Sequence, residues 1–247
     1  MTGRLNGVVA LLPVFNDARY LPGWLEAVGS HVGSVVALDD GSSDESTTIL
    51  ERSQLVEVLL RVDPSSKQGW DEPANRERLV TAGQSLEAEW FVAFDADERP
   101  ERRLWDQWLS IIAEADASEA IAIDQPLREL WNSPTTYRTD GVWGLKRKTA
   151  IFRNLEKSHV FDPAQWHGEW YPAQYIGSDA FLPINVNLYH LKMIDAAARV
   201  DRMKRYQAVD PDRAFQPIGY EYLIDEVGLS LEDIAAISDY DGHVDAP

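Results

Sequence analysis

Short apolar runs alternate with amphipathic segments through the first half of the chain. Continuous apolar runs rich in β-branched and aromatic residues predict strands that are buried on both faces. Such runs occupy residues 8–14, 35–38, 90–94 and 120–123, and residues 55–62 (LVEVLLRV) predict a further strand. Their alternation with helical segments predicts a mostly parallel sheet in a three-layer arrangement.

The segments between these runs carry helical patterns. One helical face, with i, i+3, i+4, i+7 spacing, is formed by Leu21, Trp24, Leu25 and Val28. Ser43 or Asp44 can cap a helix that runs through Leu50, and a further helix is predicted over residues 72–86. In a helix expected to begin at Pro100, a stripe typical of core packing is formed by Leu104, Trp105, Trp108, Ile111 and Ile112.

The second half of the chain, beyond about residue 125, is richer in aromatic segments, at residues 131–143 and 166–172. Aromatic side chains around a polar centre commonly hold sugars and other amphipathic ligands, although most tryptophans are core residues. This half is therefore a candidate for the binding of an amphipathic ligand.

The last quarter of the chain has three predicted elements. A strand is expected over residues 184–189 with His190 at its end, and a helix over residues 196–209. The basic residues of this helix are Arg199, Arg202, Lys204 and Arg205. They either contact a phosphate or form a solvated face. From Ser230 a short capped helix should lead to a polar tail, residues 239–247, that frays.

Composition narrows the function classes. A net charge of −18 over 247 residues argues against a nucleic-acid or anionic-membrane surface, since both need basic patches. The absence of cysteine excludes disulfides and thiolate metal sites and fits a reducing compartment. From the reducing compartment we expect a cytoplasmic location. No apolar stretch approaches the ~20 residues of a membrane helix, so we expect no integral membrane segment.

Acidic turns follow two of the predicted strands, at residues 39–44 (DDGSSD) and 95–98 (DADE). In an open α/β sheet, ligands bind outside the carboxyl ends of the strands. Asp95 and Asp97 would repel each other unless a cation lies between them, which makes them candidates for a divalent cation chelated by a nucleoside diphosphate. The alternative is a solvated acidic turn, because D-x-D is common by chance.

Three motifs occur in order at the ends of predicted strands, at residues 13–17 (PVFND), 39–44 (DDGSSD) and 94–98 (FDADE). In this order and spacing they resemble the family-2 glycosyltransferases with the GT-A fold, closely over about residues 6–125 and more loosely as far as His190. The resemblance implies an α/β fold of the GT-A type. This fold is a three-layer α/β/α sandwich with a mostly parallel central sheet, a Rossmann-like nucleotide-binding half and a C-terminal helical extension.

The resemblance also implies a domain division and an activity. Residues 1–198 would form the GT-A catalytic domain, in which residues 1–125 bind the nucleotide sugar and residues 126–198 the acceptor. Residues 199–247 would form the C-terminal helical extension. The activity would be transfer of a sugar, with inversion, from a UDP-, GDP- or TDP-sugar to a hydroxyl of a saccharide or small-molecule acceptor, with Mn²⁺ or Mg²⁺ on the diphosphate.

By the same resemblance, Asp40 would hold the nucleobase, Asp95 would lie near the ribose, and Asp97 would ligate the metal, with His190 as a further metal or diphosphate ligand. The implied nucleotide-binding residues are Pro13, Phe15, Asn16, Asp39, Asp40, Arg76, Asp95 and Ala96. A divalent cation stabilises charge on a leaving diphosphate, so the arrangement is chemically coherent.

Many relatives of this family carry an Arg-Asn pair before the acid-tipped strand, whereas this chain reads ANRER at residues 74–78, with Arg76 and Arg78 as the two candidates. Arg76 is the better candidate for a nucleotide contact because it lies nearer a helix start, where backbone N–H groups favour anions. Its alternative is a surface salt bridge to Glu72 or Glu77.

The general base is expected from the second half, which supplies the acceptor side in such enzymes. Glu169 is predicted to remove the proton of the acceptor hydroxyl, with His167 as the alternative and Asp162 and Asp179 as further candidates.

Two other function classes compete with a glycosyltransferase. A nucleotidyltransferase would need a Gly-rich, basic phosphate loop after the first strand, whereas this chain has NDAR at residues 16–19. A non-catalytic sugar or nucleotide binder on the same fold would have no use for a carboxylate base such as Glu169.

Overall fold

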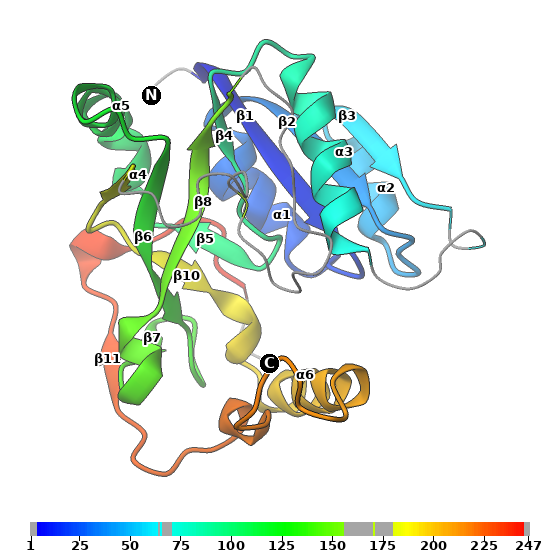
Figure 1. Cartoon of the computed structure of the whole chain (residues 1–247), viewed down its shortest axis with the longest axis vertical. Coiled ribbons are helices and arrows are strands. Elements are labelled where there is room, and N and C mark those ends of the chain that lie inside the picture. Colours follow the sequence, from blue (N-terminus) through cyan, green and yellow to red (C-terminus); the bar gives the residue numbers. More distant parts are fainter. Residues whose placement is uncertain (1–3, 64, 66–70, 156–169, 171–179, 245–247) are drawn as a thin grey trace.

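The computed structural model of the chain describes residues 4–63, 65, 71–155, 170 and 180–244 (Figure 1). The main sheet has the strand order β3-β2-β1-β4-β8-β6-β10-β5, with β9 paired to β6. Its strands are β1 (Leu5–Val14), β2 (Val32–Asp39), β3 (Val56–Arg61), β4 (Trp90–Val92), β5 (Glu98–Pro100), β6 (Ala122–Glu129), β8 (Arg147–Arg153), β9 (Phe181–Pro183) and β10 (Leu188–His190). A separate two-stranded sheet is formed by β7 (Thr136–Arg138) and β11 (Leu231–Asp233).

Helices cover both faces of the main sheet. The α-helices are α1 (Leu21–Trp24), α2 (Ser46–Arg52), α3 (Glu72–Gln84), α4 (Arg103–Asp106), α5 (Trp108–Ala117) and α6 (Ala196–Val209). Shorter turns are the π-helical η1 (Leu25–Gly29) and the 3₁₀ helices η3 (Gly141–Leu145), η5 (Leu191–Met193), η6 (Glu221–Leu223) and η7 (Ala236–Ser238).

The sheet is mostly parallel, as the sequence predicted. β1 pairs in parallel with β2 and β4, and β2 pairs in parallel with β3. β8 runs antiparallel to both β4 and β6, and β5 runs antiparallel to β10. β6 also pairs in parallel with β9 and β10. The antiparallel pairs of β8 with β4 and of β10 with β5 bring later parts of the chain beside the acidic turn that follows β4.

β1 is buried on both faces, which explains its continuous apolar run. Its Val8, Ala10 and Leu12 pack in the core cluster on the side of α1, α2 and α5. Its Val9 and Leu11 pack with α3 on the opposite side. The helices therefore form two layers around one sheet, and the predicted three-layer α/β fold is confirmed.

The region after the acidic turn differs from the prediction. Residues 98–100 form β5, which pairs with β10, so Pro100 ends a strand and does not begin a helix. The predicted single helix is divided at Gln107 into α4 and α5. The long-range pairing of β5 with a strand almost ninety residues later has no signal in the local sequence. The apolar stripe of this region is buried as expected, at Leu104, Trp105, Trp108 and Ile111.

The C-terminal segment also differs from the prediction. α6 has the predicted bounds, with the Asp195 carboxylate capping its start, and the division placed after residue 198 falls inside it. The helix expected from Ser230 is instead strand β11, which adds to β7. The predicted frayed tail contains Tyr240, which is fully buried in the core cluster of β1. Within the described ranges, no helix combines the length and the apolar character needed to cross a bilayer.

The tail is fixed to the acidic turn through Arg99, a fully buried cation. The Arg99 guanidinium donates to the carbonyl oxygens of Ala96 at 2.8 Å, Tyr20 at 2.6 Å and Gly242 at 3.2 Å. Gly242 and Gly23 lie so close that a Cβ on Gly242 would come within 2.0 Å of the Gly23 carbonyl oxygen. The C-terminal segment therefore packs beneath the acidic turn and supports it.

Gly242→Ala should destabilise the protein more than an ordinary substitution at a left-handed position. Both Gly242 (φ +69) and Gly228 (φ +74) are left-handed, but nothing lies within 4 Å of a Cβ at Gly228. The backbone strain, about 1–3 kcal/mol, is therefore common to Gly242→Ala and to the control variant Gly228→Ala. The collision with Gly23 adds about 2 kcal/mol for Gly242→Ala alone. Urea unfolding of both variants measures the difference, and equal losses would contradict this close contact.

Candidate functional site

A cavity of about 260 Å³ lies at the carboxyl ends of the parallel strands. Because β1, β2 and β4 run in parallel, the residues after each strand meet at one edge of the sheet. Predicted site residues that line the cavity are Pro13, Phe15, Asp40, Arg76, Asp95, Ala96, Asp97 and His190. Residues that the sequence analysis did not name as site residues are Val14, Asp17, Glu72, Asn75, Trp170, Lys192 and Tyr206. Arg202 and Arg205, for which it left a phosphate contact as one of two alternatives, also line the cavity.

The loop after β1 forms the wall beside Asp40. The backbone N–H of Asp40 donates to the Val14 carbonyl at 2.8 Å, which joins the ends of β1 and β2. Asn16 and Asp39 do not line the cavity. The Asn16 side chain accepts from the Ser43 N–H at 2.7 Å, and Asp39 accepts from the Ser42 N–H at 2.9 Å. Both residues therefore shape the two loops that carry the cavity wall.

Arg76 lines the cavity near the start of α3, whereas Arg78 is exposed and does not. The Arg76 guanidinium forms a salt bridge with Glu72 and lies 5.1 Å from the ring centroid of Trp170. The two alternatives for Arg76, a salt bridge and a ligand contact, are therefore compatible, because Arg76 forms the salt bridge with Glu72 and also lines the cavity. Arg76 is the arginine of this pair that is placed to reach a ligand.

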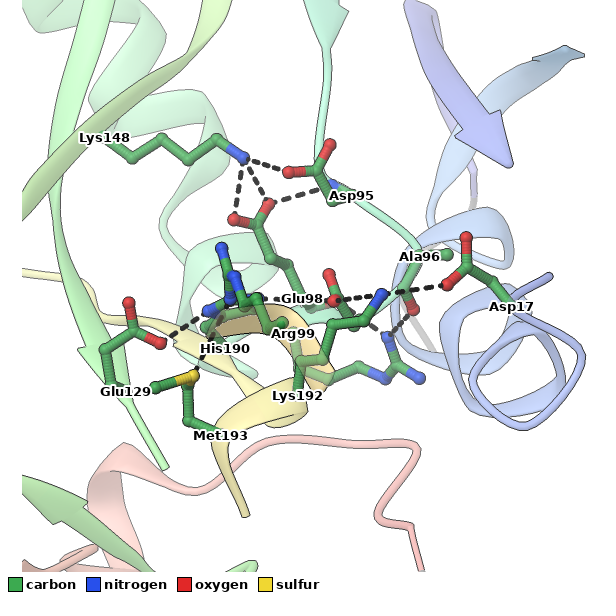
Figure 2. A network of polar contacts seen from close by, with 12 residues as sticks. Asp17, Asp95, Ala96, Glu98, Arg99, Glu129, Lys148, His190, Lys192 and Met193 are labelled. Carbon is green, nitrogen blue, oxygen red and sulfur yellow. Dashed lines mark hydrogen bonds and ion pairs between the residues drawn. The ribbon is translucent and has the colours of Figure 1, made fainter. Parts of the chain in front are cut away.

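Asp95 is held by an ion pair network with Lys148 and the buried Glu98, which the sequence analysis missed (Figure 2). The Lys148 ammonium, on β8, lies 2.8 Å from the Asp95 carboxylate and 2.7 Å from both oxygens of Glu98. Glu98 also accepts from the backbone N–H of Asp95 at 2.8 Å. Burial alone would lower the pKa of Lys148, but the two carboxylates outweigh it and raise that pKa. The Asp95 side chain, 45% exposed, is thereby fixed at the cavity edge.

Asp97 and His190 are brought together by the pairing of β5 with β10. His190 Nε2 lies 3.3 Å from Asp97 Oδ2, and His190 Nδ1 lies 2.5 Å from Glu129 on β6. All three side chains are less than a tenth exposed. Burial alone would lower the pKa of His190, but the carboxylates of Glu129 and Asp97 raise it to about 10. The imidazole is therefore a cation at neutral pH.

Lys192 provides a second cation beside Asp97. Its ammonium lies 3.5 Å from Asp17 Oδ1 (Figure 2). It also lies 3.5 Å from Asp97 Oδ2. Although burial would raise the pKa of Asp97, His190 and Lys192 hold it well below its usual range. Burial raises the pKa of Asp17 to about 6, against the opposing effect of Lys192. Lys192 follows the predicted strand end at His190, and this position was its only sequence signal.

The basic helix α6 divides its positive charges between packing and the cavity. Arg199 is buried, with its guanidinium 4.1 Å from the Trp131 ring centroid and 3.1 Å from Glu226. Arg202 and Arg205 line the cavity, and Lys204 is exposed. The helix is thus neither a wholly solvated face nor a wholly phosphate-facing one, because two of its four basic residues face the cavity.

The predicted general bases lie outside the described residues. These are Glu169 and His167, together with the further candidates Asp162 and Asp179. Trp170, which adjoins Glu169 in sequence, is described and lines the cavity. The predictions for the acceptor side therefore stay predictions.

The residues around Asp97 offer two donors to a divalent metal. A separation of 3.3 Å between Asp97 Oδ2 and His190 Nε2 suits adjacent ligands of one octahedral ion, at ~2.1 Å from each. Glu129 on the other ring nitrogen is the partner that metal-ligating histidines usually have. Across the described ranges, no cluster of three or more acidic, His or Cys side chains could hold a metal. The protein donors therefore fit a metal that takes its remaining ligands from a bound phosphate and water.

Comparisons with known proteins begin with sequence. No family model matches the chain. It is 24% identical over 240 residues to the uncharacterized proteins Mb3815c of Mycobacterium bovis and Rv3786c of Mycobacterium tuberculosis. Each match covers 92% of this chain and 58% of the relative, so the chain spans less than two thirds of the length of these relatives.

Solved structures share the fold. S. aureus TarS matches with a TM-score of 0.53 and 12% identity, over 78% of this chain and 39% of TarS. TarS 1–349 in complex with UDP matches with a TM-score of 0.52 and 12% identity, over 78% and 65% of the two chains. A mycobacterial protein matches with a TM-score of 0.51 and 13% identity, over 79% and 72%. The chain therefore has the α/β fold of GT-A glycosyltransferases, as predicted, and at these identities the likeness shows the fold alone.

Lys148→Met should destabilise the protein by about 3 kcal/mol, because it leaves the buried Glu98 carboxylate without the cation that compensates it. Lys204→Met, at an exposed position, should change the free energy of unfolding by less than about 0.5 kcal/mol. Chemical denaturation of both variants tests the difference. Adding Glu98→Gln to Lys148→Met should recover part of the loss, since it removes an unpaired buried charge. Equal stability of the two lysine variants would contradict the buried ion pairs.

Proposed function

We propose that this chain is a glycosyltransferase that takes its sugar from a nucleoside diphosphate sugar. The observation that carries the proposal is the convergence of Asp40, Asp95 and Asp97 on one cavity at the carboxyl ends of parallel strands. This edge is where open α/β sheets bind their ligands. The GT-A fold supports the proposal, and the solved complex of TarS 1–349 with UDP favours UDP as the nucleotide to test first.

The donor would lie along the cavity from β1 to η5. Its nucleobase would lie between the loop after β1, where Pro13 and Phe15 line the cavity, and the Asp40 and Arg76 side. Asp95 would accept a hydrogen bond from the ribose, because Lys148 and Glu98 hold its carboxylate at the cavity edge. The diphosphate would then reach Asp97, His190 and the basic residues of η5 and α6.

Asp97 and His190 would hold a divalent metal, Mn²⁺ or Mg²⁺, on the diphosphate. Such a metal, when bound, stabilises the negative charge that develops on the departing nucleoside diphosphate. Asp97 offers a carboxylate that is ionised at neutral pH because its neighbours depress its pKa. His190 must release a proton to become a ligand, and Glu129 holds the ring in the orientation that directs Nε2 to the metal position.

The acceptor would be a saccharide or small molecule bound on the side of the second half. Glu169, or His167 as the alternative, would take the proton from its attacking hydroxyl, and transfer would proceed with inversion. Glu169→Gln should abolish transfer while leaving donor binding unchanged, because the amide cannot act as a base. A loss of donor binding would instead place Glu169 at the nucleotide.

Calorimetric titration with UDP, GDP and TDP, each with and without Mn²⁺, tests the proposed function. We expect UDP to bind and the metal to tighten its binding. Asp97→Asn should remove the effect of the metal while leaving the fold intact, because the neutral amide is a poorer ligand for a hard cation. Asp201→Asn on the exposed surface of α6 is the matched control and should bind as the unmodified protein does. Failure of all three nucleotides to bind would overturn the proposal.

Glu129→Gln should weaken the binding of UDP with Mn²⁺ by about 10–100-fold, the usual effect of losing the partner of a metal-ligating histidine. The binding of UDP without metal should change far less. Glu114→Gln, at an exposed position of α5, controls for the lost charge. An unchanged metal effect in Glu129→Gln would show that the orientation of His190 does not matter for the metal.

A further inference from the structure

Lys192 lies between two buried carboxylates that come from distant parts of the chain. It belongs to η5, directly after His190, and its ammonium is 3.5 Å from both Asp17 Oδ1 and Asp97 Oδ2. The side chains of Asp17 and Asp97 are 13% and 9% exposed, and that of Lys192 is 29% exposed. All three line the cavity, so a ligand that enters meets this ion pair directly.

The Lys192 ammonium is paired with Asp97 Oδ2, the carboxylate oxygen that a metal would need as a ligand. Asp97 Oδ2 faces both Lys192 Nζ at 3.5 Å and His190 Nε2 at 3.3 Å. A divalent ion that bound Asp97 alone would lie against the ammonium, where two positive charges repel each other at low dielectric. The unliganded cavity is therefore already neutralised and is a poor site for a free metal ion.

Lys192 is better able to move than Arg202, the cation next to it. Its contacts at 3.5 Å are long for charge-assisted hydrogen bonds, and its ammonium ends a flexible four-carbon stem with three donors. Arg202, the next cation along, is held by the Tyr206 hydroxyl at 3.0 Å and lies 3.5 Å from His190 Nε2. An anionic ligand in the cavity would thus draw Lys192 away from Asp97 more readily than it would move Arg202.

We propose that Lys192 is an internal counter-ion that excludes free divalent metal from Asp97 and transfers to an anionic oxygen of the ligand when a metal and a nucleoside diphosphate enter together. This inference rests on the proposed function. The diphosphate brings the negative charge that the added metal requires, and it offers the ammonium a new partner. Metal and nucleotide therefore bind with positive coupling, and each strengthens the binding of the other by the same factor.

Lys192→Met tests this proposal by changing two affinities in opposite directions. Mn²⁺ alone should bind the variant about tenfold more tightly, because Asp17 and Asp97 lose their internal cation. UDP in the presence of Mn²⁺ should bind about tenfold more weakly, because the diphosphate loses a donor, and changes of this size are typical of coupled sites. Calorimetry measures both affinities, and electron paramagnetic resonance of free Mn²⁺ checks the first.

Two controls separate the charge from its position. Lys192→Arg keeps the charge and should retain the positive coupling, whereas Lys204→Met removes an exposed charge from α6 and should leave both affinities within about twofold. If Lys192→Met does not fold, Lys192→Gln provides the same comparison, because its amide can still donate to both carboxylates.

The outcomes distinguish this proposal from the proposed function. If the unmodified protein binds UDP with Mn²⁺ and Lys192→Met leaves the Mn²⁺ affinity unchanged or weaker, the counter-ion role is overturned and the proposed function stands. If the unmodified protein binds no nucleotide with or without Mn²⁺, both are overturned. A gain in Mn²⁺ affinity together with a loss in UDP affinity supports both.

Discussion

The burial of several carboxylates at one edge of the sheet is the constraint on which the site depends. Asp97, Glu98 and Glu129 are each less than a tenth exposed. An unpaired ionised carboxylate in such a place costs several kcal/mol. Each of them therefore has a cation that reaches it from another element, at Lys146, Lys148, His190 and Lys192. The site is stable only when these elements are assembled.

Because each buried carboxylate needs a cation from another element, the antiparallel strands are needed to bring those cations to the site. The parallel half of the sheet supplies the acidic turns, as any α/β sheet of this kind does. Lys148 lies on β8 and Lys146 directly before it, while His190 ends β10 and Lys192 lies in the following η5. They lie at that edge because β8 pairs with β4 and β10 pairs with β5. A loss of strand pairing would thus leave the buried carboxylates without their cations, in addition to breaking backbone hydrogen bonds. The fold and the electrostatics of the cavity stabilise each other.

Local patterns were enough to predict the elements whose burial is visible in their own stretch of sequence. β1 and α6 appeared where the apolar run and the helical periodicity placed them, because continuous burial and periodicity are local signals. β5 did not, since Glu98 and Arg99 are charged and become buried only through β10 and the tail. The acids of the cavity were predictable because they follow strands. Lys148 and Lys192 were not assigned to it, because only tertiary pairing puts them beside those acids.

The overall charge and the local charge of the cavity have opposite effects on an anionic donor. A net charge of −18 repels a nucleoside diphosphate at long range, but salt screens this repulsion beyond ~8 Å at physiological ionic strength. The cations that line the cavity, Arg76, His190, Lys192, Arg202 and Arg205, act at contact distance, where screening is weak. Selectivity for the proposed donor thus depends on short-range contacts within the cavity, and approach to it depends little on long-range attraction. An acidic protein can in this way bind one anion tightly and still repel nucleic acids.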